Sequence, residues 1–163
     1  MTEPCVYKTE GRSRPARVRS PRPVTVNVSW PTMVNAIDQV KERLRRHPAV
    51  RYEMGESHIT IHPSDGDGFR VSLSTSPEGY TVSFDGWHEE FASEAEALNC
   101  LAFGLSPGCR LRVEYRGQSP YRWTVEALQD GRWQAGSTTG LVFVPFWRSR
   151  RTLYRQNRLV AGD

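Results

Sequence analysis

The sequence predicts an α+β fold, with an antiparallel sheet of five to seven strands and two helices packed on one of its faces. Two observations support this prediction. Several short segments alternate apolar and polar residues, the pattern of antiparallel strands with one buried and one hydrated face. Two longer segments, about 32–46 and 93–104, repeat apolar residues at helical spacing. Each helix offers a single apolar stripe, so the helices can cover a sheet face but cannot form a core between themselves.

Length and composition are those of a single soluble domain. The 163 residues are 37% hydrophobic and 25% charged. No apolar run approaches the ~20 residues that span a bilayer. The first residues contain no apolar segment typical of a secretory signal, so we expect a cytoplasmic protein. An odd number of cysteines argues against a disulfide framework, and Cys100 and Cys109 are expected to be buried thiols.

The chain divides into three regions by composition. Residues 1–23 are rich in proline and arginine and poor in large apolar side chains, which predicts a disordered basic arm. Residues 24–145 form the predicted α+β domain. This domain begins with an alternating segment at 24–30, which predicts a short strand or an extended lead-in. Residues 146–163 form a basic C-terminal segment that also contains aromatic side chains.

Charge is segregated along the chain. Residues 1–22 carry six Lys/Arg and two Glu, and residues 147–163 carry five Arg and one Asp, so each end has a net charge of +4. The remaining 124 residues carry eleven Lys/Arg and fifteen Asp/Glu, for a net charge of −4. An acidic body with two basic ends is therefore expected, and a polyanionic partner would have to bind the ends.

Each predicted helix has identifiable boundaries. Residues 31–32 can open the first helix, and basic side chains near its end suit the negative pole of the helix dipole. In the second helix, Ser93 and Glu96 fit a capping box. Gly104 and Pro107 supply its stop. The apolar stripes comprise Val34, Ile37, Val40 and Leu44 in the first helix, and Leu98, Leu101, Ala102 and Leu105 in the second.

Strands are predicted on both sides of the second helix. Segments 58–62, 69–74 and 80–84 alternate before it, and segments 111–115 and 121–125 alternate after it. Turn residues separate neighbouring segments, so they should pair as antiparallel hairpins.

Two further strands are predicted near the end of the domain. One begins at 132–134, and an apolar run at 141–144 is typical of a buried final strand, with Gly136 and Gly140 bending the chain between them. The two halves also align with an offset of 52 residues, which suggests a pseudo-repeat of one helix followed by three strands. Chance similarity between hairpins is the alternative explanation.

The alternation assigns side chains to the two faces of the predicted sheet. The face that the helices should cover comprises Phe69, Val71, Leu73, Tyr80, Val82, Phe84, Leu111, Val113, Tyr121, Trp123 and Val125. The opposite face, expected to be hydrated or to meet a polar partner, comprises Arg70, Ser72, Ser74, Thr81, Ser83, Arg112, Glu114, Arg122, Thr124 and Glu126.

One cluster between the third strand and the second helix could carry chemistry. Asp85, His88 and Glu89 are general acid–base groups close to Trp87, and such groups can move protons or bind metal. However, no recognised spacing is present, and carboxylates at a helix entry are also favoured by the helix dipole. These three residues are therefore weak catalytic candidates. No cofactor-binding motif occurs, so no cofactor is expected.

Two other patterns resemble metal sites but fail on geometry. His58 and His62 are four positions apart on a predicted strand, which separates them by about 13 Å, too far to share a zinc ion. Residues 64–68 resemble the start of a calcium loop. Counted from Asp65, however, the position of the required glutamate ligand is occupied by Ser76. No metal site is predicted.

The C-terminal segment supplies the candidate binding residues. Arginine and aromatic side chains are interleaved there, a composition of protein-binding hot spots and of nucleic-acid contacts. An amphipathic segment that packs its apolar side chains on its own sheet would have the same composition. The candidate partner-binding residues are Trp147, Arg148, Arg150, Arg151, Tyr154 and Arg155.

Because no catalytic signature is present, we expect a non-enzymatic interaction module that binds a protein partner through this segment. Binding of single-stranded nucleic acid by the two basic ends is one alternative, with an anionic membrane surface as a related ligand. An enzyme or metal site around His88 is the other alternative.

Overall fold

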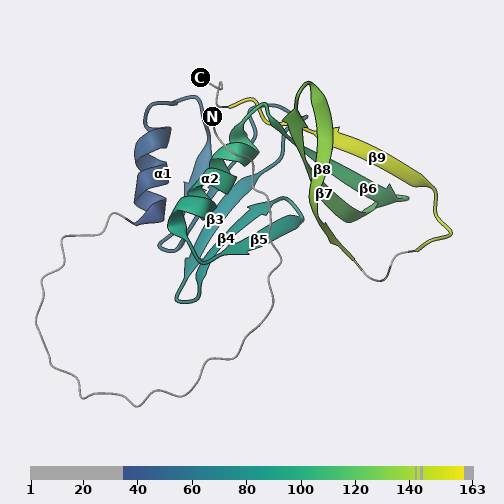
Figure 1. Cartoon of the computed structure of the whole chain (residues 1–163), viewed down its shortest axis with the longest axis horizontal. Coiled ribbons are helices and arrows are strands. Elements are labelled where there is room, and N and C mark those ends of the chain that lie inside the picture. The colour runs from purple at the N-terminus through teal and green to yellow at the C-terminus, as the bar shows by residue number, and fades with distance from the viewer. Residues whose placement is uncertain (1–34, 142, 144, 160–163) are drawn as a thin grey trace, which may run out of the picture. The chain divides into compact units, whose positions relative to one another are not determined.

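The computed structural model describes residues 35–141, 143 and 145–159. The predicted arm at 1–23 and the predicted strand at 24–30 lie outside the described residues. The described part of the chain forms two helices and nine strands, arranged in two antiparallel sheets (Figure 1). The predicted α+β class is confirmed, with the strands divided between a five-stranded sheet and a four-stranded sheet. Neither described helix is long and apolar enough to cross a membrane.

Helix α1 spans Ala36–Leu44 and ends two residues before the predicted end at 46, whereas the predicted start at 31–32 lies outside the described residues. It begins after Asn35, whose side-chain oxygen accepts a hydrogen bond from the backbone N–H of Ile37 at 3.3 Å. This cap satisfies one of the amide donors that a helix leaves free at its start. Three residues of the predicted apolar stripe, Ile37, Val40 and Leu44, are buried as predicted, and Val34 lies outside the described residues.

The five-stranded sheet, called sheet A, is a meander in which each strand pairs with the next along the chain. Its strands are β1 (Tyr52–Met54), β2 (His58–Ile61), β3 (Val71–Ser76), β4 (Gly79–Phe84) and β5 (Trp87–Phe91).

Strands β1 and β5 were not predicted. Residues 87–91 were expected to enter the helix, but they form β5 because Asp85 and Gly86 make a two-residue turn. Asp85 adopts a φ of 50° in this turn, a value that aspartate tolerates better than most residues. An Asp-Gly pair between apolar residues is a strong hairpin signal, so the sequence contained the information.

The register of sheet A places its apolar side chains on one face. Ile61, Val71, Phe84 and Trp87 lie opposite one another across four strands. The rings of Phe84 and Trp87 stack with centroids 4.7 Å apart. Figure 1 shows helix α2 lying across the middle of this sheet, and α2 contacts β3, β4 and β5.

Helix α2 spans Glu94–Leu105, but its first turn differs from the prediction. Ser93 occupies the N-cap position without a side-chain capping bond to any described residue, so the predicted capping box with Glu96 is wrong. Instead, the carboxylate of Glu94 accepts hydrogen bonds from Gln39 on α1 and from the Tyr80 hydroxyl on β4, the latter at 3.1 Å. Glu94 therefore connects α2 to both α1 and sheet A.

The apolar side of α2 is largely as predicted. Leu98, Leu101 and Leu105 are buried, whereas Ala102 is exposed. The predicted burial of the Cys100 and Cys109 thiols is confirmed.

The four-stranded sheet, called sheet B, follows α2 and has the order β8-β7-β6-β9. Its strands are β6 (Cys109–Arg116), β7 (Ser119–Gln129), β8 (Arg132–Gly140) and β9 (Arg150–Arg155). The buried final strand predicted at 141–144 is wrong, because Leu141 and Phe143 are exposed. Strand β9 was not predicted, and it pairs with β6 instead.

The inner face of sheet B, defined here as the face that carries the buried Leu111, Val113 and Val125, belongs to the common core. Side-chain hydrogen bonds also join sheets A and B, and in one of them the indole N–H of Trp87 donates to the Ser137 hydroxyl at 2.8 Å. Sheet A is a five-stranded meander, whereas only β6, β7 and β8 of sheet B pair in chain order, and the pseudo-repeat stays a prediction.

Candidate functional site

Charge is distributed unequally between the two sheets. Residues 35–109, which contain both helices and sheet A, carry twelve acidic and six basic side chains, for a net charge of −6. Residues 110–155, which contain nearly all of sheet B, carry nine arginines and three acidic side chains, for +6. The basic character of the chain is therefore not confined to its ends, and sheet B is the side of the domain that favours an anionic partner.

The outer face of sheet B, which is opposite the inner face, carries a network of arginines around two glutamates. The carboxylate of Glu126 lies 2.6 Å from Arg110 Nε and 2.8 Å from an Arg112 terminal nitrogen. Thr124 and Glu126 are only 1% and 3% exposed, so their predicted hydration is wrong. The long arginine side chains cover this face, and ion pairing makes burial of the Glu126 charge tolerable.

The second glutamate is Glu114. Its carboxylate accepts a hydrogen bond from the Tyr121 hydroxyl at 2.8 Å, and it lies within 4 Å of Arg112, Arg122 and Arg150. Burial opposes ionisation of Glu114, but the Tyr121 hydroxyl and the arginines outweigh it and lower its pKa below the ordinary value. Glu114 is therefore a stable anion that holds the arginines of three strands in place.

Tyr121 reaches Glu114 because of an irregularity in strand pairing. The β6–β7 register shifts between Glu114 and Tyr115, with Glu114 opposite Arg122 and Tyr115 opposite Pro120. Tyr121 is the extra residue at this bulge, and its hydroxyl bonds on the outer face. Strict alternation predicted Tyr121 on the core side with Trp123. Its burial is confirmed, but the bulge changes its direction.

Arg110 lies at the centre of an aromatic sandwich on the outer face. Its guanidinium carbon is 4.4 Å from the ring centroid of Trp133 on β8 and 4.4 Å from that of Tyr154 on β9. These cation–π contacts stabilise the position of Arg110 in addition to its ion pair with Glu126. Tyr154, a predicted partner-binding residue, therefore already has one ring face occupied. The sequence did not indicate Arg110 or Trp133, because they come together only through strand order.

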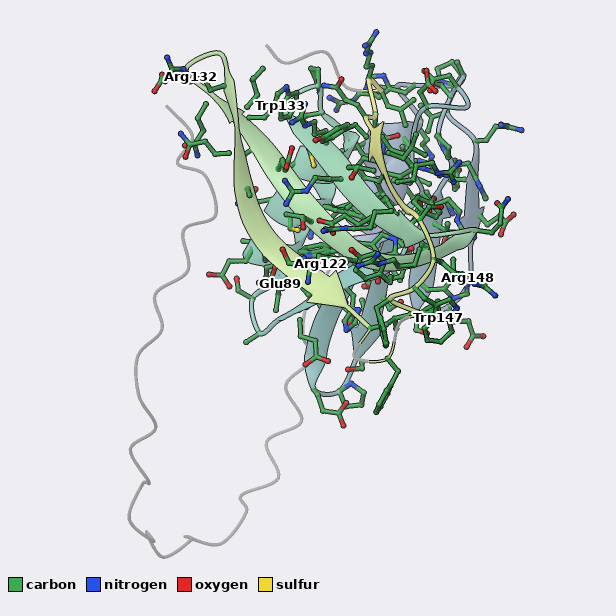
Figure 2. All side chains as sticks on the ribbon, turned by 90° about the vertical axis from the view of Figure 1, so that its right-hand side faces the viewer. Glu89, Arg122, Arg132, Trp133, Trp147 and Arg148 are labelled. Carbon is green, nitrogen blue, oxygen red and sulfur yellow. The ribbon has the colours of Figure 1, made fainter. Side chains whose placement is uncertain are left out.

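The segment between β8 and β9 exposes large apolar side chains. The described residues of this segment, 141, 143 and 145–149, are called the apolar loop. Phe143 is 95% exposed, and Phe146 and Trp147 are each 74% exposed. The rings of Phe146 and Trp147 meet edge to face with centroids 5.2 Å apart. In Figure 2, Trp147 and Arg148 lie together at one end of sheet B, away from Arg132 and Trp133 on β8.

Strand β9 is an edge strand, because β6 is the only described strand that pairs with it. The Gly117 N–H donates to Ser149 O at 2.9 Å, so the backbone groups of Ser149 point toward β6. This fixes the side to which each following backbone N–H of β9 points. Backbone groups of successive residues in an antiparallel strand point to opposite sides. The backbone N–H groups of Arg150, Thr152 and Tyr154 therefore face outward from the sheet.

The remaining predicted partner-binding residues occupy three different environments. The backbone oxygen of Arg148 accepts a hydrogen bond from Arg116 at 3.1 Å, which attaches the apolar loop to β6. The guanidinium of Arg151 lies over the Tyr115 ring at 4.6 Å. Arg155 points to sheet A, where it pairs with Asp85 at 3.3 Å. The C-terminal segment is thus partly an exposed surface and partly a structural element.

The residues after β9 attach the C-terminal segment to the first half of the domain. Asn157 is buried and hydrogen-bonds to the backbone of Phe69 and of Gly104. The Gln156 N–H donates to Asp67 O at 2.9 Å, and the Leu159 N–H donates to Leu105 O at 3.2 Å. No pattern in the sequence distinguishes this asparagine from one in a loop.

The three weak catalytic candidates lie in different surroundings. His88 is exposed on β5, and its side chain makes no hydrogen bond or ion pair with a described residue. Glu89, its neighbour on the strand, points to the opposite face, where one carboxylate oxygen is buried without a described hydrogen-bond partner. Asp85 lies in the β4–β5 turn between Arg70 and Arg155. Among the described residues, no three His, Cys, Asp or Glu side chains form a group that could hold a metal ion.

No family model, curated protein or solved structure matches this chain. The candidate site is therefore the apolar loop together with the outer edge of β9, as defined by geometry and charge.

Proposed function

We propose that this protein is a non-enzymatic interaction module that binds an acidic, extended protein segment along the outer edge of β9. The observation that carries the proposal is an edge strand whose outward amides lie beside the exposed Phe146–Trp147 pair. An added strand would gain main-chain hydrogen bonds from β9 and side-chain contacts from the apolar loop.

The chemistry of the partner follows from the residues around this edge. Arg150 is 64% exposed in its side chain, and the surrounding half of the domain has an excess of six positive charges. Carboxylates on the partner would complement these arginines. Trp and Phe side chains bury large areas with little loss of side-chain entropy, so Phe146 and Trp147 are suited to anchor apolar residues of the partner.

A protein partner fits this surface better than single-stranded nucleic acid. Base stacking needs free aromatic faces, but Arg110 lies over the rings of both Trp133 and Tyr154. Glu114 and the buried Glu126 offset part of the positive charge that phosphates would meet. The exposed aliphatic and phenylalanine side chains at Leu141 and Phe143 favour contacts with apolar groups rather than with phosphates.

The test begins with selection of random twelve-residue peptides displayed against the full chain. We expect enrichment of peptides in which carboxylates alternate with apolar residues. A selected peptide is then labelled, and its Kd is measured by fluorescence anisotropy. Thr152→Pro removes one outward N–H of β9, and a proline is tolerated on an edge strand at such a position. This variant should weaken binding at least tenfold.

Matched variants separate the edge from general effects. Thr152→Val keeps the amide and should bind as wild type does. Trp147→Ser should weaken binding, whereas Tyr52→Ser, which removes an exposed aromatic ring from β1, should not. Equal affinity of Thr152→Pro and Thr152→Val would refute strand addition. Tighter binding of a twenty-nucleotide oligothymidylate, with a steep salt dependence, would favour the nucleic-acid alternative.

A further inference from the structure

An open cleft of about 470 Å³ lies between sheet A and sheet B, on the side of sheet B away from the arginine network. One wall is formed by the β4–β5 turn and the loop before β3, including Asp85 and Arg70. The other wall is the inner face of sheet B, including Val113, Tyr115 and Trp123. This volume falls within the range of pockets that hold small organic molecules.

One end of the cleft is polar and carries an excess of positive charge. Asp85 lies between two guanidinium groups, with Oδ1 at 3.4 Å from Arg70 Nε and Oδ2 at 3.3 Å from an Arg155 terminal nitrogen. Each guanidinium has five N–H donors, so a single carboxylate leaves most of them free for an additional acceptor. Asp85 orients the two guanidinium groups and leaves a net charge of +1 at this end.

The inner face of sheet B supplies apolar and aromatic side chains to the cleft. Its walls include Val113 together with the rings of Tyr115 and Trp123. The Trp123 ring lies directly against Gly86, because a Cβ atom at that glycine would be 2.2 Å from Trp123 Cε2. This contact fixes the indole, so the aromatic wall is formed before any ligand enters.

We infer that this cleft binds a small organic anion that has one carboxylate and a planar apolar body. The carboxylate accepts hydrogen bonds from Arg70 and Arg155, since a guanidinium matches carboxylate geometry in a paired arrangement. The planar body lies against Val113 and Trp123, because the Arg151 guanidinium already covers one face of the Tyr115 ring. A single negative charge is preferred to a phosphate monoester, because the cleft has an excess of one positive charge. This inference does not depend on partner binding at β9.

The probe for this site is 2-naphthoate, titrated into the full chain and followed by proton–nitrogen NMR spectra. We expect shifts of the Gly86 amide and of the Trp123 indole N–H. Acetate supplies the charge without the ring, and 2-naphthylmethylamine supplies the ring with the opposite charge. Each should bind at least tenfold more weakly than 2-naphthoate.

Arginine variants locate the binding site. Arg70→Gln and Arg155→Gln should each weaken 2-naphthoate binding at least fivefold, whereas Arg132→Gln, at the far end of β8 (Figure 2), should leave it unchanged. The Arg70 side chain is 62% exposed, so its variant keeps the fold even if Arg155→Gln loosens the two sheets. Absent binding, equal binding of the amine, or wild-type affinity in Arg70→Gln would each overturn the inference.

Discussion

The carboxamide of Asn157 pairs with the backbone of Phe69 in both directions. The Phe69 N–H donates to Asn157 Oδ1 at 3.1 Å, and Asn157 Nδ2 donates to Phe69 O at 2.9 Å. The same nitrogen donates to Gly104 O at 3.0 Å. One side chain near the end of the described chain therefore satisfies backbone groups of the loop before β3 and of helix α2.

Replacement of Asn157 by alanine should lower the free energy of unfolding by about 2–5 kcal/mol. The substitution leaves several buried backbone groups without a hydrogen-bond partner, and each such group costs about 1–3 kcal/mol. Urea unfolding measures the effect. Arg158→Ala changes the exposed neighbour and should leave the midpoint unchanged. Equal midpoints for the two variants would show that Asn157 does not stabilise the fold.

Leu101→Ala should lower the free energy of unfolding by about 2–5 kcal/mol, because it removes a buried side chain of α2 and leaves a cavity. The same urea titration should give an unchanged slope and a lower midpoint. Asn99→Ala, on the exposed side of the same helix, is the control. A wild-type midpoint for Leu101→Ala would mean that the core face of α2 is misassigned.

Gly104→Ala should destabilise the protein even though alanine favours helices. The added methyl group would lie 2.4 Å from the Phe84 ring, which is fully buried and cannot move outward. We expect a net loss of about 1–3 kcal/mol, because overpacking exceeds the helix-propensity gain of about 1 kcal/mol.

A double-mutant cycle tests the cause of that loss. Phe84→Leu reduces the side-chain volume that faces Gly104. The double variant should therefore lose less free energy of unfolding than the sum of the losses in the two single variants. Additive losses would place the origin of the Gly104→Ala effect elsewhere in the helix.

Glu114→Gln should change the pH dependence of stability. The folded-state pKa of Glu114 lies below its ordinary value of 4.5, so ionised Glu114 stabilises the folded protein at pH values above that value. This contribution is complete near neutral pH and is lost as the pH falls below 4.5 through the folded-state pKa.

The variant should therefore be less stable than wild type by about 1–3 kcal/mol at pH 7, and the difference should shrink at acid pH. Thermal or urea unfolding between pH 2 and 7 measures it, with Glu96→Gln on the exposed surface of α2 as the control. A difference that stays constant down to pH 2 would contradict a lowered pKa.

Cys100 and Cys109 should resist alkylation in the folded protein. Both thiols are buried, and burial raises the pKa of the Cys109 thiol, which reduces the reactive thiolate. In a Cys5→Ser background, mass spectrometry after iodoacetamide treatment should show no label without denaturant and two labels in urea. Leu128→Cys places a thiol at an exposed position and should react quickly. Comparable rates for the buried thiols would contradict the assigned core.

The sequence predicted those helices and strands in which apolar residues recur at regular spacing because one side of the element is buried. The alternation at Val71 and Leu73 identified β3, and the spacing of Leu98, Leu101 and Leu105 identified α2. These signals are strong because each element has one buried side, which imposes a period of two or 3.6 on its apolar residues.

The sequence was less informative where tertiary contacts determine the structure. Strand β9 has no buried apolar face, so it lacks the alternation that identifies other strands. Glu126 is buried because two arginines of the neighbouring strand β6 cover it, and the bulge at Tyr121 shifts the alternation locally. Of the candidate residues, Asp85 and Arg155 came from separate predictions, and their contact could not be foreseen without the strand order.

Strand β9 is synthesised after every other described element, which has a consequence for the nascent chain. Asn157 and Phe69 are separated by 88 positions, so their hydrogen bonds cannot form until the ribosome has produced both sheets. Before that moment, β6 presents an open edge, and pairings of such long range also form slowly. Growing chains on neighbouring ribosomes should therefore be most prone to associate through β6 during this interval.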